Sequence, residues 1–351
     1  MKIGLIAFNN IKYCPYINCY TTILNEQNID YSIIYFDRDG ENCENEKIIP
    51  IYWNKKKSKL FNFVCFKKKV IKILNKKSFD YLIVLTTLPG ILLQNYLKRK
   101  YKYKYIIDIR DYTYEKYFIF YYVEKKMIKY STMSVISSLG FINFLPKYEY
   151  TLCHNTTYTL PNNHYPSINK KESIIIGYVG TISYKKYCKK LIDLVLNDDR
   201  FCFYFYGNES NGDEIQNCIA TLNNNRIKYF GKYSPSEKGK IIEKIDILFN
   251  VYGNESPLVK YALSNKLYDA FFYRKPLLTS KDTFMSTYAS IYSFDLDINI
   301  ENLNALYDWY VNIDVQKMNN FMNNKENQFF YENENFKLNI INKICKGGKN
   351  E

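Results

Sequence analysis

The chain has 351 residues, of which 47% are hydrophobic, and a formal net charge of +14. This length exceeds what one small core needs and suits two domains of ordinary size, so a single small module is excluded. The excess of positive charge favours polyanions, phosphorylated ligands and anionic membrane surfaces as partners.

The cysteines and histidines exclude two kinds of stabilising site. Nine cysteines occur without any Cys-x-x-Cys pair, and His154 and His164 are the two histidines of the chain. Neither a disulfide framework nor a zinc site is therefore expected. The start is a short apolar strand rather than a signal peptide, and the most apolar windows fall short of the roughly twenty residues that span a bilayer. We expect a cytoplasmic protein that is at most peripheral to the membrane.

The first half alternates short apolar runs with longer amphipathic segments. The runs expected to be strands are 2–8, 30–36, 80–87, 104–111, 131–138 and 150–155. Helices are expected over 60–75 and 91–100 and around 140–145. This alternation of strand and helix predicts a doubly wound parallel sheet.

Charged residues gather where the strand 104–111 ends. Asp108, Arg110 and Asp111 lie together in IIDIRDYTYEKY (106–117). At the carboxyl edge of a sheet these side chains are well placed to bind an acceptor substrate. Arg110 and Asp111 are therefore catalytic candidates. An internal salt bridge of Arg110 with either aspartate explains the cluster equally well.

Basic runs are also concentrated in the first half, at 55–57, 67–69, 98–104 and 125–129. The segment 114–130 places aromatic residues beside lysines, as at an anionic membrane surface. Solvated helix faces, or a core helix with a basic edge, explain the same pattern. A nucleic-acid partner is not expected, because no nucleic-acid-binding motif is present and the lysines do not form one stripe.

The segment 162–173, rich in Asn, Pro, Ser and Lys, predicts a linker. After it, strands are expected at 174–183, 201–207, 226–234, 246–253, 275–280 and 290–295, with helices over 186–197, 213–223, 236–244 and 264–273. We therefore predict two α/β domains, residues 1–168 and 169–330, with a ligand cleft between them at the carboxyl ends of the strands. The tail 331–351 is expected to be partly helical and to pack back on the first domain.

Two glycines follow predicted strands of the second domain. Gly180 lets the backbone approach a ligand, and the helix start after it directs free N–H groups at phosphate. Thr181 adds a hydroxyl and Lys185 a charge. Gly207 offers a second close approach, for a base or a ribose. Ordinary turns between strand and helix are the alternative at both places.

The helix expected from Ser264 onward has an unusual first turn. The helix dipole disfavours a cation such as Lys266 there unless an anion lies nearby. Asp269, one turn further on, can accept two hydroxyl hydrogen bonds. A diphosphate above the helix start and a ribose diol satisfy both side chains, whereas a solvated Lys–Asp pair is the alternative.

These segments resemble a known family. The order GYVGTISYKK, FYFYG, IKYFGKYS and NVYGNESPLVKYALSNKLYDAFFYRKPLL is similar to the carboxyl-terminal domain of GT-B glycosyltransferases, in particular bacterial family 4 enzymes of capsule, exopolysaccharide and lipopolysaccharide gene clusters. YIIDIRDYTYEK resembles the acceptor domain of the same enzymes. The resemblance implies two Rossmann-like domains facing a central cleft. It also implies retaining transfer of a sugar from a nucleotide-diphosphate sugar to a glycan or lipid-linked acceptor.

The resemblance assigns roles to residues. It implies that the donor phosphates lie by Gly180–Thr181 and near Lys266, and that Asp269 holds the ribose. No metal or other cofactor is implied, because basic groups and helix N-termini stabilise the leaving diphosphate. The loop before this helix and the helix start supply further substrate-binding candidates, namely Asn254, Ser256 and Asn265.

One departure from the family concerns the catalytic carboxylate. The family often carries two glutamates eight positions apart, whereas here Asp269 stands at the second position and Tyr261 at the first. Glu255 is the substitute that we carry forward as a catalytic candidate. The departure leaves an alternative open, a non-catalytic relative that binds a nucleotide or a glycan without turnover.

Overall fold

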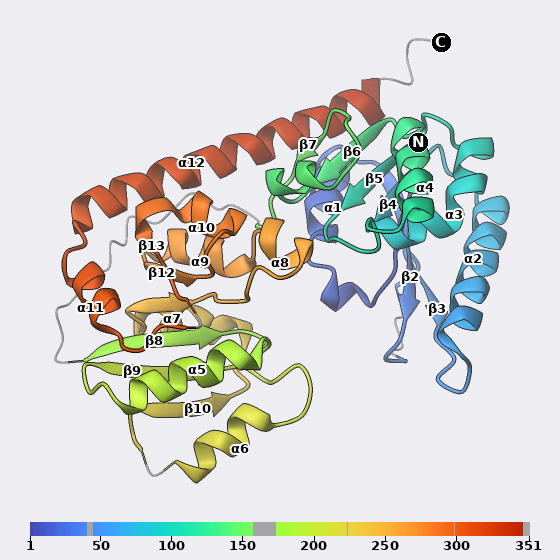
Figure 1. The fold of residues 1–351 in the computed structure, drawn as a ribbon. Helices are drawn as coiled ribbons and strands as arrows, with labels where there is room; N and C mark the ends of the chain where they lie inside the picture. The colour runs from blue at the N-terminus through green and yellow to red at the C-terminus, as the bar shows by residue number, and fades with distance from the viewer. Residues whose placement is uncertain (41–44, 157–172, 223, 298, 347–351) are drawn as a thin grey trace. The chain divides into compact units, whose positions relative to one another are not determined.

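The computed structural model describes residues 1–40, 45–156, 173–222, 224–297 and 299–346. The chain divides into two compact units, the first comprising residues 1–157 and 330–351 and the second residues 158–329. Each is an α/β unit built on a parallel sheet (Figure 1). The predicted boundary at residue 168, and the predicted linker apart from Ser173, lie outside the described residues.

The sheet of the first unit has seven strands in the order β3-β2-β1-β4-β5-β6-β7. The strand order reverses between β1 and β4, as in a doubly wound sheet. One edge strand, β3, was not predicted. Its sequence IIPIY contains a proline, and proline is tolerated in a sheet mainly at an edge strand. The strands are β1 Lys2–Ala7, β2 Asp30–Asp37, β3 Ile48–Tyr52, β4 Tyr81–Leu85, β5 Tyr105–Ile109, β6 Met133–Ile136 and β7 Thr151–Leu152.

Helices cover both faces of this sheet. The connections β1–β2 and β3–β4 run in opposite directions across the sheet, so right-handed crossovers place α1 on one face and α2 on the other. Side chains of α1 share a core cluster with Phe336, Ile340 and Ile344 near the chain's end. Helices α2, α3 and α4 pack in sequence as one layer. The helical segments are η1 Ile11–Tyr13, α1 Ile17–Glu26, α2 Lys59–Lys76, α3 Thr87–Lys100, α4 Phe118–Lys129 and η2 Leu139–Asn143, with η5 Ile341–Lys346 after α12.

Two predicted helices differ in the structure. Helix α3 begins at Thr87 rather than near residue 91. Pro89 lies in its first turn, where backbone N–H groups have no partner within the helix, so the N–H that proline lacks is not needed there. The helix expected around 140–145 is a short 3₁₀ turn, η2.

The second unit has a six-stranded parallel sheet in the order β10-β9-β8-β11-β12-β13. Its strands are β8 Ile174–Val179, β9 Phe201–Tyr206, β10 Ile227–Gly231, β11 Ile247–Phe249, β12 Leu277–Thr279 and β13 Ser293–Asp295. The helical segments are α5 Lys185–Leu196, α6 Glu214–Thr221, η3 Pro235–Glu237, α7 Lys238–Glu243, α8 Pro257–Tyr261, α9 Asn265–Phe272, α10 Phe284–Ala289, η4 Ser290–Tyr292 and α11 Asn304–Val311. The α-helices α8, α10 and α11 were not predicted, and η4 occupies the start of the strand that was expected at 290–295. The α/β fold class and the parallel sheets are confirmed.

The sheet of the second unit is buried on both faces. Ile176 and Tyr178 of β8 point into a core completed by α5 and α11. Val179 points to the opposite face, where it packs with residues of α7 and α9. This alternation is the two-residue period of a strand, and it produces the nearly continuous apolar sequence of β8.

One long helix, α12 Val315–Ile340, supplies side chains to both cores. Met318, Met322 and Phe329 belong to a core cluster of the second unit. Phe336 and Ile340 belong to the cluster of the first unit under α1. Within the described residues, none of the helices is both long enough and apolar enough to cross a membrane.

Helix α4 buries an acid in the first unit. Glu124 is fully buried on the side of α4 that faces the unit. Burial, followed by the nearby charge of Glu115, raises its pKa from 4.5 to about 8. Glu124 is therefore largely protonated in the folded protein at neutral pH.

This raised pKa predicts a pH-dependent stability. Between about pH 4.5 and 8 the unfolded chain ionises Glu124 while the folded chain keeps its proton, so stability falls as pH rises through this range. Glu124→Gln should raise the free energy of unfolding at pH 8 by about 1–3 kcal/mol and change it little at pH 4.5. Urea unfolding of both proteins at the two pH values measures this. An equal effect at both pH values would contradict the prediction.

Candidate active site

The candidate residues divide between the two units. Arg110 and Asp111 belong to the first unit, and the remaining candidates belong to the second. In both units they follow strands or begin helices at the carboxyl edge of the sheet, where ligands of doubly wound folds bind.

A pocket of about 290 Å³ lies at this edge of the first unit. Its lining comes from the residues that follow β1, β4 and β5, the strands at and next to the reversal of strand order. Asp111 is among the lining residues, and desolvation raises its pKa while Arg110 opposes the rise. The other lining residues are Phe8, Asn9, Tyr13, Cys14, Tyr16, Thr86, Thr87, Leu88 and Thr113. The pocket therefore combines one carboxylate with hydroxyl, amide and aromatic groups.

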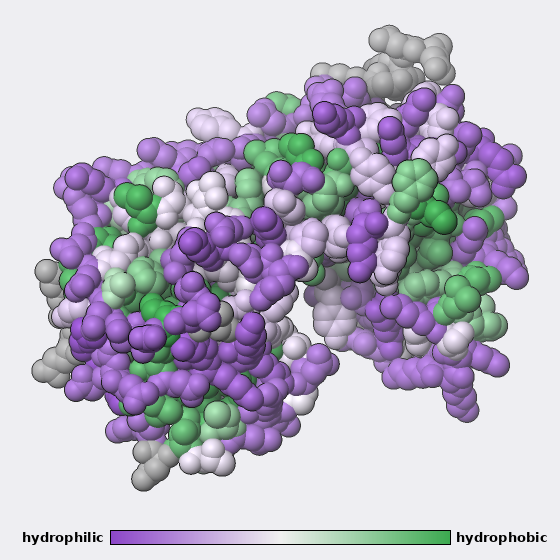
Figure 2. Space-filling model, viewed as in Figure 1, coloured by the Kyte–Doolittle hydropathy of each residue, from purple (hydrophilic) through white to green (hydrophobic). Residues whose placement is uncertain are grey.

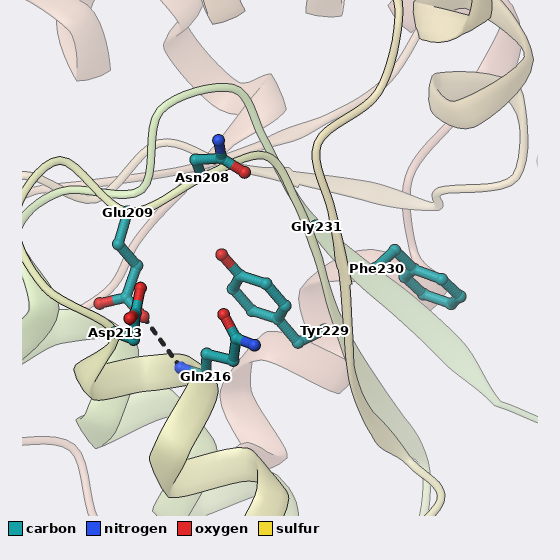
Figure 3. Close-up of a pocket in the computed structure, with 7 residues that line it drawn as sticks. All are labelled: Asn208, Glu209, Asp213, Gln216, Tyr229, Phe230 and Gly231. Atoms are coloured by element: carbon teal, nitrogen blue, oxygen red, sulfur yellow. Dashed lines mark hydrogen bonds between the residues drawn. The ribbon is translucent and has the colours of Figure 1, made fainter.

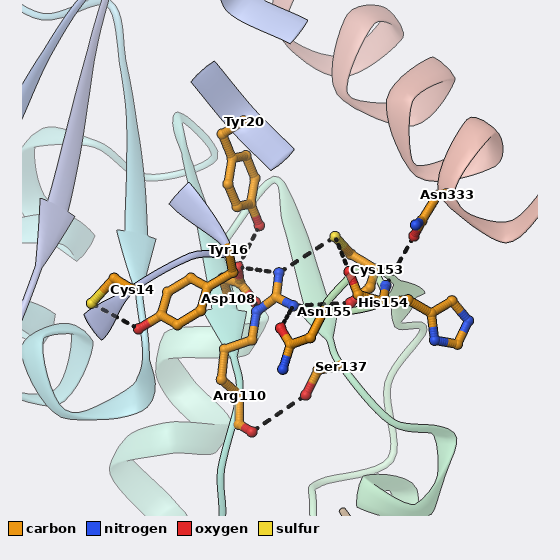
Figure 4. A network of polar contacts seen from close by, with 10 residues as sticks. All are labelled: Cys14, Tyr16, Tyr20, Asp108, Arg110, Ser137, Cys153, His154, Asn155 and Asn333. Carbon is orange, nitrogen blue, oxygen red and sulfur yellow. Dashed lines mark hydrogen bonds and ion pairs between the residues drawn. The ribbon is translucent and has the colours of Figure 1, made fainter. Parts of the chain in front are cut away.

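The side chain of Arg110 is held in the interior of the first unit. Its guanidinium is buried and forms a two-point ion pair with Asp108, with N–O distances of 2.7 Å at both contacts. Its Nη1 also donates to the carbonyl of Cys153 at 3.0 Å and to Oδ1 of Asn155 at 2.8 Å (Figure 4). The internal salt bridge, which was the alternative interpretation of this cluster, is therefore present in the structure and engages the guanidinium of Arg110 within the unit.

The same network holds the end of β5 against its neighbours. Tyr20 of α1 donates to Asp108 at 2.8 Å, and the Arg110 guanidinium lies 5.0 Å from the ring centre of Tyr16. Ser137 donates to the backbone carbonyl of Arg110 at 3.3 Å. Because a buried ion pair is costly to break, this network fixes the backbone that leads into Asp111.

In the second unit, two glycine turns are packed against one another. Gly180 has a φ of +113° and Gly207 a φ of +132°. A Cβ on Gly207 would lie 2.0 Å from the carbonyl oxygen of Gly180. The hydroxyl of Tyr178 donates to the carbonyl of Thr181 and accepts from the N–H of Ser183, each at 3.0 Å. The turn after β8 is therefore held in one conformation, with Thr181 exposed on it.

Lys266 lies beside this turn. Its Nζ is 4.0 Å from the place that a Cβ on Gly180 would occupy. The side chain is only 8% exposed, and Nζ donates to the hydroxyl of Tyr252 at 2.5 Å. It also lies 4.4 Å from the ring centre of Tyr178. The structure thus brings together the predicted phosphate turn and the predicted lysine.

Asp269 forms its ion pair with a cation other than Lys266. Its Oδ1 pairs with Nζ of Lys238, which begins α7, at 2.6 Å. Burial raises the pKa of Asp269, and the charge of Lys238 opposes this rise. The solvated Lys–Asp helix pair is therefore wrong, because Lys266 is buried and Asp269 has a different partner. Asn265 is exposed at the helix start.

Lys185 is engaged within the unit. Its Nζ pairs with Oε2 of Glu209 at 2.7 Å, and the other oxygen of Glu209 accepts from the N–H groups of Ile215 and Gln216 at the start of α6, each at 2.9 Å. Glu209 therefore joins the helix starts of α5 and α6 and raises the pKa of Lys185. Lys185 has no need of a bound phosphate to balance its charge.

Glu209 also lines a pocket of about 480 Å³ that sequence reasoning missed. Figure 3 shows the hydroxyl of Tyr229 pointing into it and Phe230 pointing away. The lining residues are Asn208, Glu209, Asp213, Gln216, Tyr229, Phe230 and Gly231. The sequence feature that could have indicated this pocket is the Asn-Glu pair that directly follows Gly207 at the end of a strand.

The loop after β11 is fastened to the end of β12. Ser280 Oγ accepts from the N–H of Gly253 at 2.7 Å, and the Asn254 amide donates to the carbonyl of Lys281 at 3.0 Å. Glu255 is exposed and accepts from the hydroxyl of Tyr187 at 2.6 Å, which lowers the pKa of Glu255. Ser256 is the N-cap residue of α8. Hydrogen bonds between side chains and backbone hold the loop, and the Glu255 carboxylate stays exposed to solvent.

Sequence reasoning also missed the partners of these candidates, namely Tyr178, Tyr252, Tyr187 and Lys238. With 37 tyrosines in the chain, no single one is conspicuous. In the described residues, no group of three or more His, Cys, Asp or Glu side chains is close enough to hold a metal ion.

The packing of the two glycine turns predicts the effect of one methyl group. Gly207→Ala should lower the free energy of unfolding by about 3 kcal/mol or more, because the added Cβ meets the Gly180 carbonyl. Gly212→Ala is the matched control, since Gly212 also has positive φ, +61°, but no atom lies within 4 Å of its Cβ position. It should cost about 1 kcal/mol. Denaturant unfolding compares them, and equal losses would show that the turns do not touch.

Comparisons with known proteins identify the fold. No family model and no curated protein sequence matches the chain. The lipopolysaccharide outer core galactosyltransferase WaaB superposes with a TM-score of 0.68 and 14% identity, over 96% of this chain and 99% of WaaB. HepE of Anabaena, solved with UDP and glucose, superposes with a TM-score of 0.66 and 15% identity over the full length of both chains. A UDP-GlcNAc 2-epimerase from Methanocaldococcus jannaschii superposes with a TM-score of 0.55 and 11% identity, over 90% of this chain and 94% of its own. The chain therefore has the GT-B fold, the fold of glycosyltransferases such as WaaB.

Proposed function

We propose that the chain is a glycosyltransferase that moves a sugar from a nucleotide-diphosphate sugar to a glycan or a lipid-linked oligosaccharide. The observation that carries the proposal is the position of the Lys266 ammonium at the start of α9, directly beside the Gly180 turn. A buried cation at a helix N-terminus next to a glycine turn is well suited to an anion such as diphosphate. The solved complexes of HepE with UDP and with UDP-glucose support a nucleotide-sugar donor.

The donor diphosphate is proposed to lie between the Gly180–Thr181 turn and Lys266. Here Tyr252 accepts a hydrogen bond from Lys266, and a phosphate oxygen would take over that bond or share it. Asp269 is proposed to hold the ribose diol, with Lys238 keeping its carboxylate ionised against the effect of burial. Lys185, paired with Glu209, is removed from the phosphate contacts.

Departure of the diphosphate places negative charge where Lys266 and the N–H groups at the start of α5 lie. The N-cap residue of α5, Tyr184, makes no side-chain hydrogen bond to those groups. Stabilisation of a leaving group by fixed donors needs no proton transfer and no metal ion. We propose metal-independent transfer, with retention of configuration as the family resemblance implies. Asn254, Glu255, Ser256 and Asn265 are proposed as contacts to the donor sugar, with Glu255 as the catalytic candidate.

The acceptor is proposed to bind in the pocket of the first unit, where Asp111 can accept a hydrogen bond from a sugar hydroxyl. The protein is proposed to work in the cytoplasm, peripheral to the inner face of the membrane. Capsule or lipopolysaccharide synthesis is the proposed setting.

A second candidate function is binding without turnover. It is favoured by Tyr261, which stands where the family often has its first glutamate. Turnover separates the two candidates, since only the glycosyltransferase consumes a nucleotide sugar, whereas the alternative binds a nucleotide or a glycan and leaves it unchanged.

The donor site predicts a metal-independent thermal shift. Among UDP, GDP, CDP, ADP and dTDP, one should stabilise the protein by about 2.7 kcal/mol at a hundred times its dissociation constant, with or without EDTA. Lys266→Ala and Asp269→Ala should each weaken that binding by about 1–3 kcal/mol. Lys260→Ala, in the partly exposed helix α8, is the control and should bind like the wild type. Wild-type affinity in either site variant would remove that residue from the donor site.

The acceptor pocket predicts a separation of binding from transfer. Asp111→Asn should leave nucleotide affinity unchanged and lower the rate of transfer by about 10²–10⁴-fold if the carboxylate contacts the reacting hydroxyl. Nucleotide release from the donor in the presence of acceptor measures the rate. Asp30→Asn, a carboxylate of the same unit that pairs with Lys2 at the amino end of β2, is the control and should transfer at the wild-type rate. Loss of nucleotide affinity in Asp111→Asn would indicate misfolding instead.

A further inference from the structure

Helix α4 begins with apolar side chains that face solvent. Phe118 is 79% and Ile119 78% exposed, and Tyr117 and Tyr122 are also exposed. The Phe118 and Tyr122 rings stack, with 6.3 Å between their centres. The buried side of the helix carries Glu124, Met127 and Ile128 instead. Large apolar groups gathered in water indicate an interaction surface.

The charge around these side chains has a single sign. The two acids of the segment 114–130, Glu115 and Glu124, are both buried. Its four lysines remain at the surface: Lys116, Lys125 and Lys129 are exposed, and Lys126 covers the ring of Tyr122 at 4.3 Å. The outer face of α4 is thus apolar and cationic.

Helix α2 repeats this pattern. Leu60 is 74% exposed, and Phe61 and Val64 are exposed beside it in the first turns. The residues 53–79, which include the whole helix, contain no acid, and lysine occurs at 55–57, 59, 67–69, 72, 76 and 77. Lys57 lies over the ring of Phe61 at 5.7 Å.

Both helix starts lie at the same edge of the first unit. Helices α2, α3 and α4 each connect the carboxyl end of one parallel strand to the amino end of the next, so all three begin at the carboxyl edge. The pocket that contains Asp111 is at that edge too, since Thr87 and Leu88 of α3 line it. Figure 2 shows hydrophobic residues on the first unit interspersed with hydrophilic ones.

We propose that this edge of the first unit docks on an anionic bilayer, with the exposed starts of α2 and α4 inserted among the lipid head groups and the lysines paired with lipid phosphates. Aliphatic side chains such as Ile119 and Leu60 gain nothing from nucleic acid, whereas insertion at a bilayer surface removes them from water. The lysines around them lack exposed acidic neighbours in both segments and so complement a negatively charged surface.

Docking at this edge indicates which kind of acceptor the protein uses. This part of the inference rests on the proposed glycosyltransferase function. A pocket at the bilayer-facing edge receives a sugar that is attached to a membrane lipid. Of the two acceptor classes proposed above, the lipid-linked one therefore applies. A lipid anchor keeps such an acceptor concentrated at the surface where the protein docks.

The test is co-sedimentation of the full chain with vesicles of phosphatidylcholine alone and of phosphatidylcholine with about 30% phosphatidylglycerol. The wild type should bind the anionic vesicles, and binding should weaken when salt rises from 0.1 M to 0.5 M. Phe118→Ser with Ile119→Ser, and separately Leu60→Ser with Phe61→Ser, should each reduce vesicle binding by about tenfold. Tyr331→Ser with Leu338→Ser removes two exposed apolar residues of α12 and should bind like the wild type.

Thermal unfolding of each variant and its shift with the nucleoside diphosphate separate the outcomes. Absence of wild-type binding to anionic vesicles, equal binding to neutral vesicles, or folded patch variants that bind like the control would each overturn the docking surface. Displacement of the vesicles by short duplex DNA would assign the lysines to nucleic acid and overturn it as well. A wild type that binds vesicles but no nucleoside diphosphate would retain the surface and remove the proposed function.

Discussion

The buried ammonium of Lys266 is the interaction on which the candidate donor site depends. At the start of a helix its charge opposes the helix dipole, and burial adds a desolvation cost. The hydroxyl of Tyr252 and the ring face of Tyr178 offset part of this cost. Tyr178 also holds the glycine turn, so one side chain positions both the cation and the backbone next to it. A charge that lowers stability, yet is held in place by several neighbouring side chains, is typical of a functional site.

The two units use charge in opposite ways. In the first unit Arg110 and Asp108 neutralise one another in the interior and leave Asp111 at the pocket. In the second unit a cation is kept next to the turn, and the nearby carboxylate of Asp269 is directed to Lys238. A neutral network with one open carboxylate suits hydroxyl groups, whereas a cation held beside a glycine turn suits phosphate.

Much of this arrangement was predictable from the sequence, because it follows from short-range patterns. The apolar runs of β1 and β8, the glycine at position 180 and the lysine in the first turn of α9 are each visible in a few adjacent residues. The pairing of Asp269 with Lys238 and the burial of Arg110 were not predictable, because each depends on side chains that meet only in the folded unit. Helix α8 has five residues, too few for a helical period to show.

Helix α12 has a consequence for the order in which the molecule is made. The first unit covers one face of its sheet with Phe336, Ile340 and Ile344, which are translated after every residue of the second unit. While the ribosome is still extending the chain, the apolar side chains under α1 lack this cover, although the strands that carry them emerged first. The strands of the first unit are thus made first, whereas the core beneath α1 is completed only when the last residues of the chain have been added.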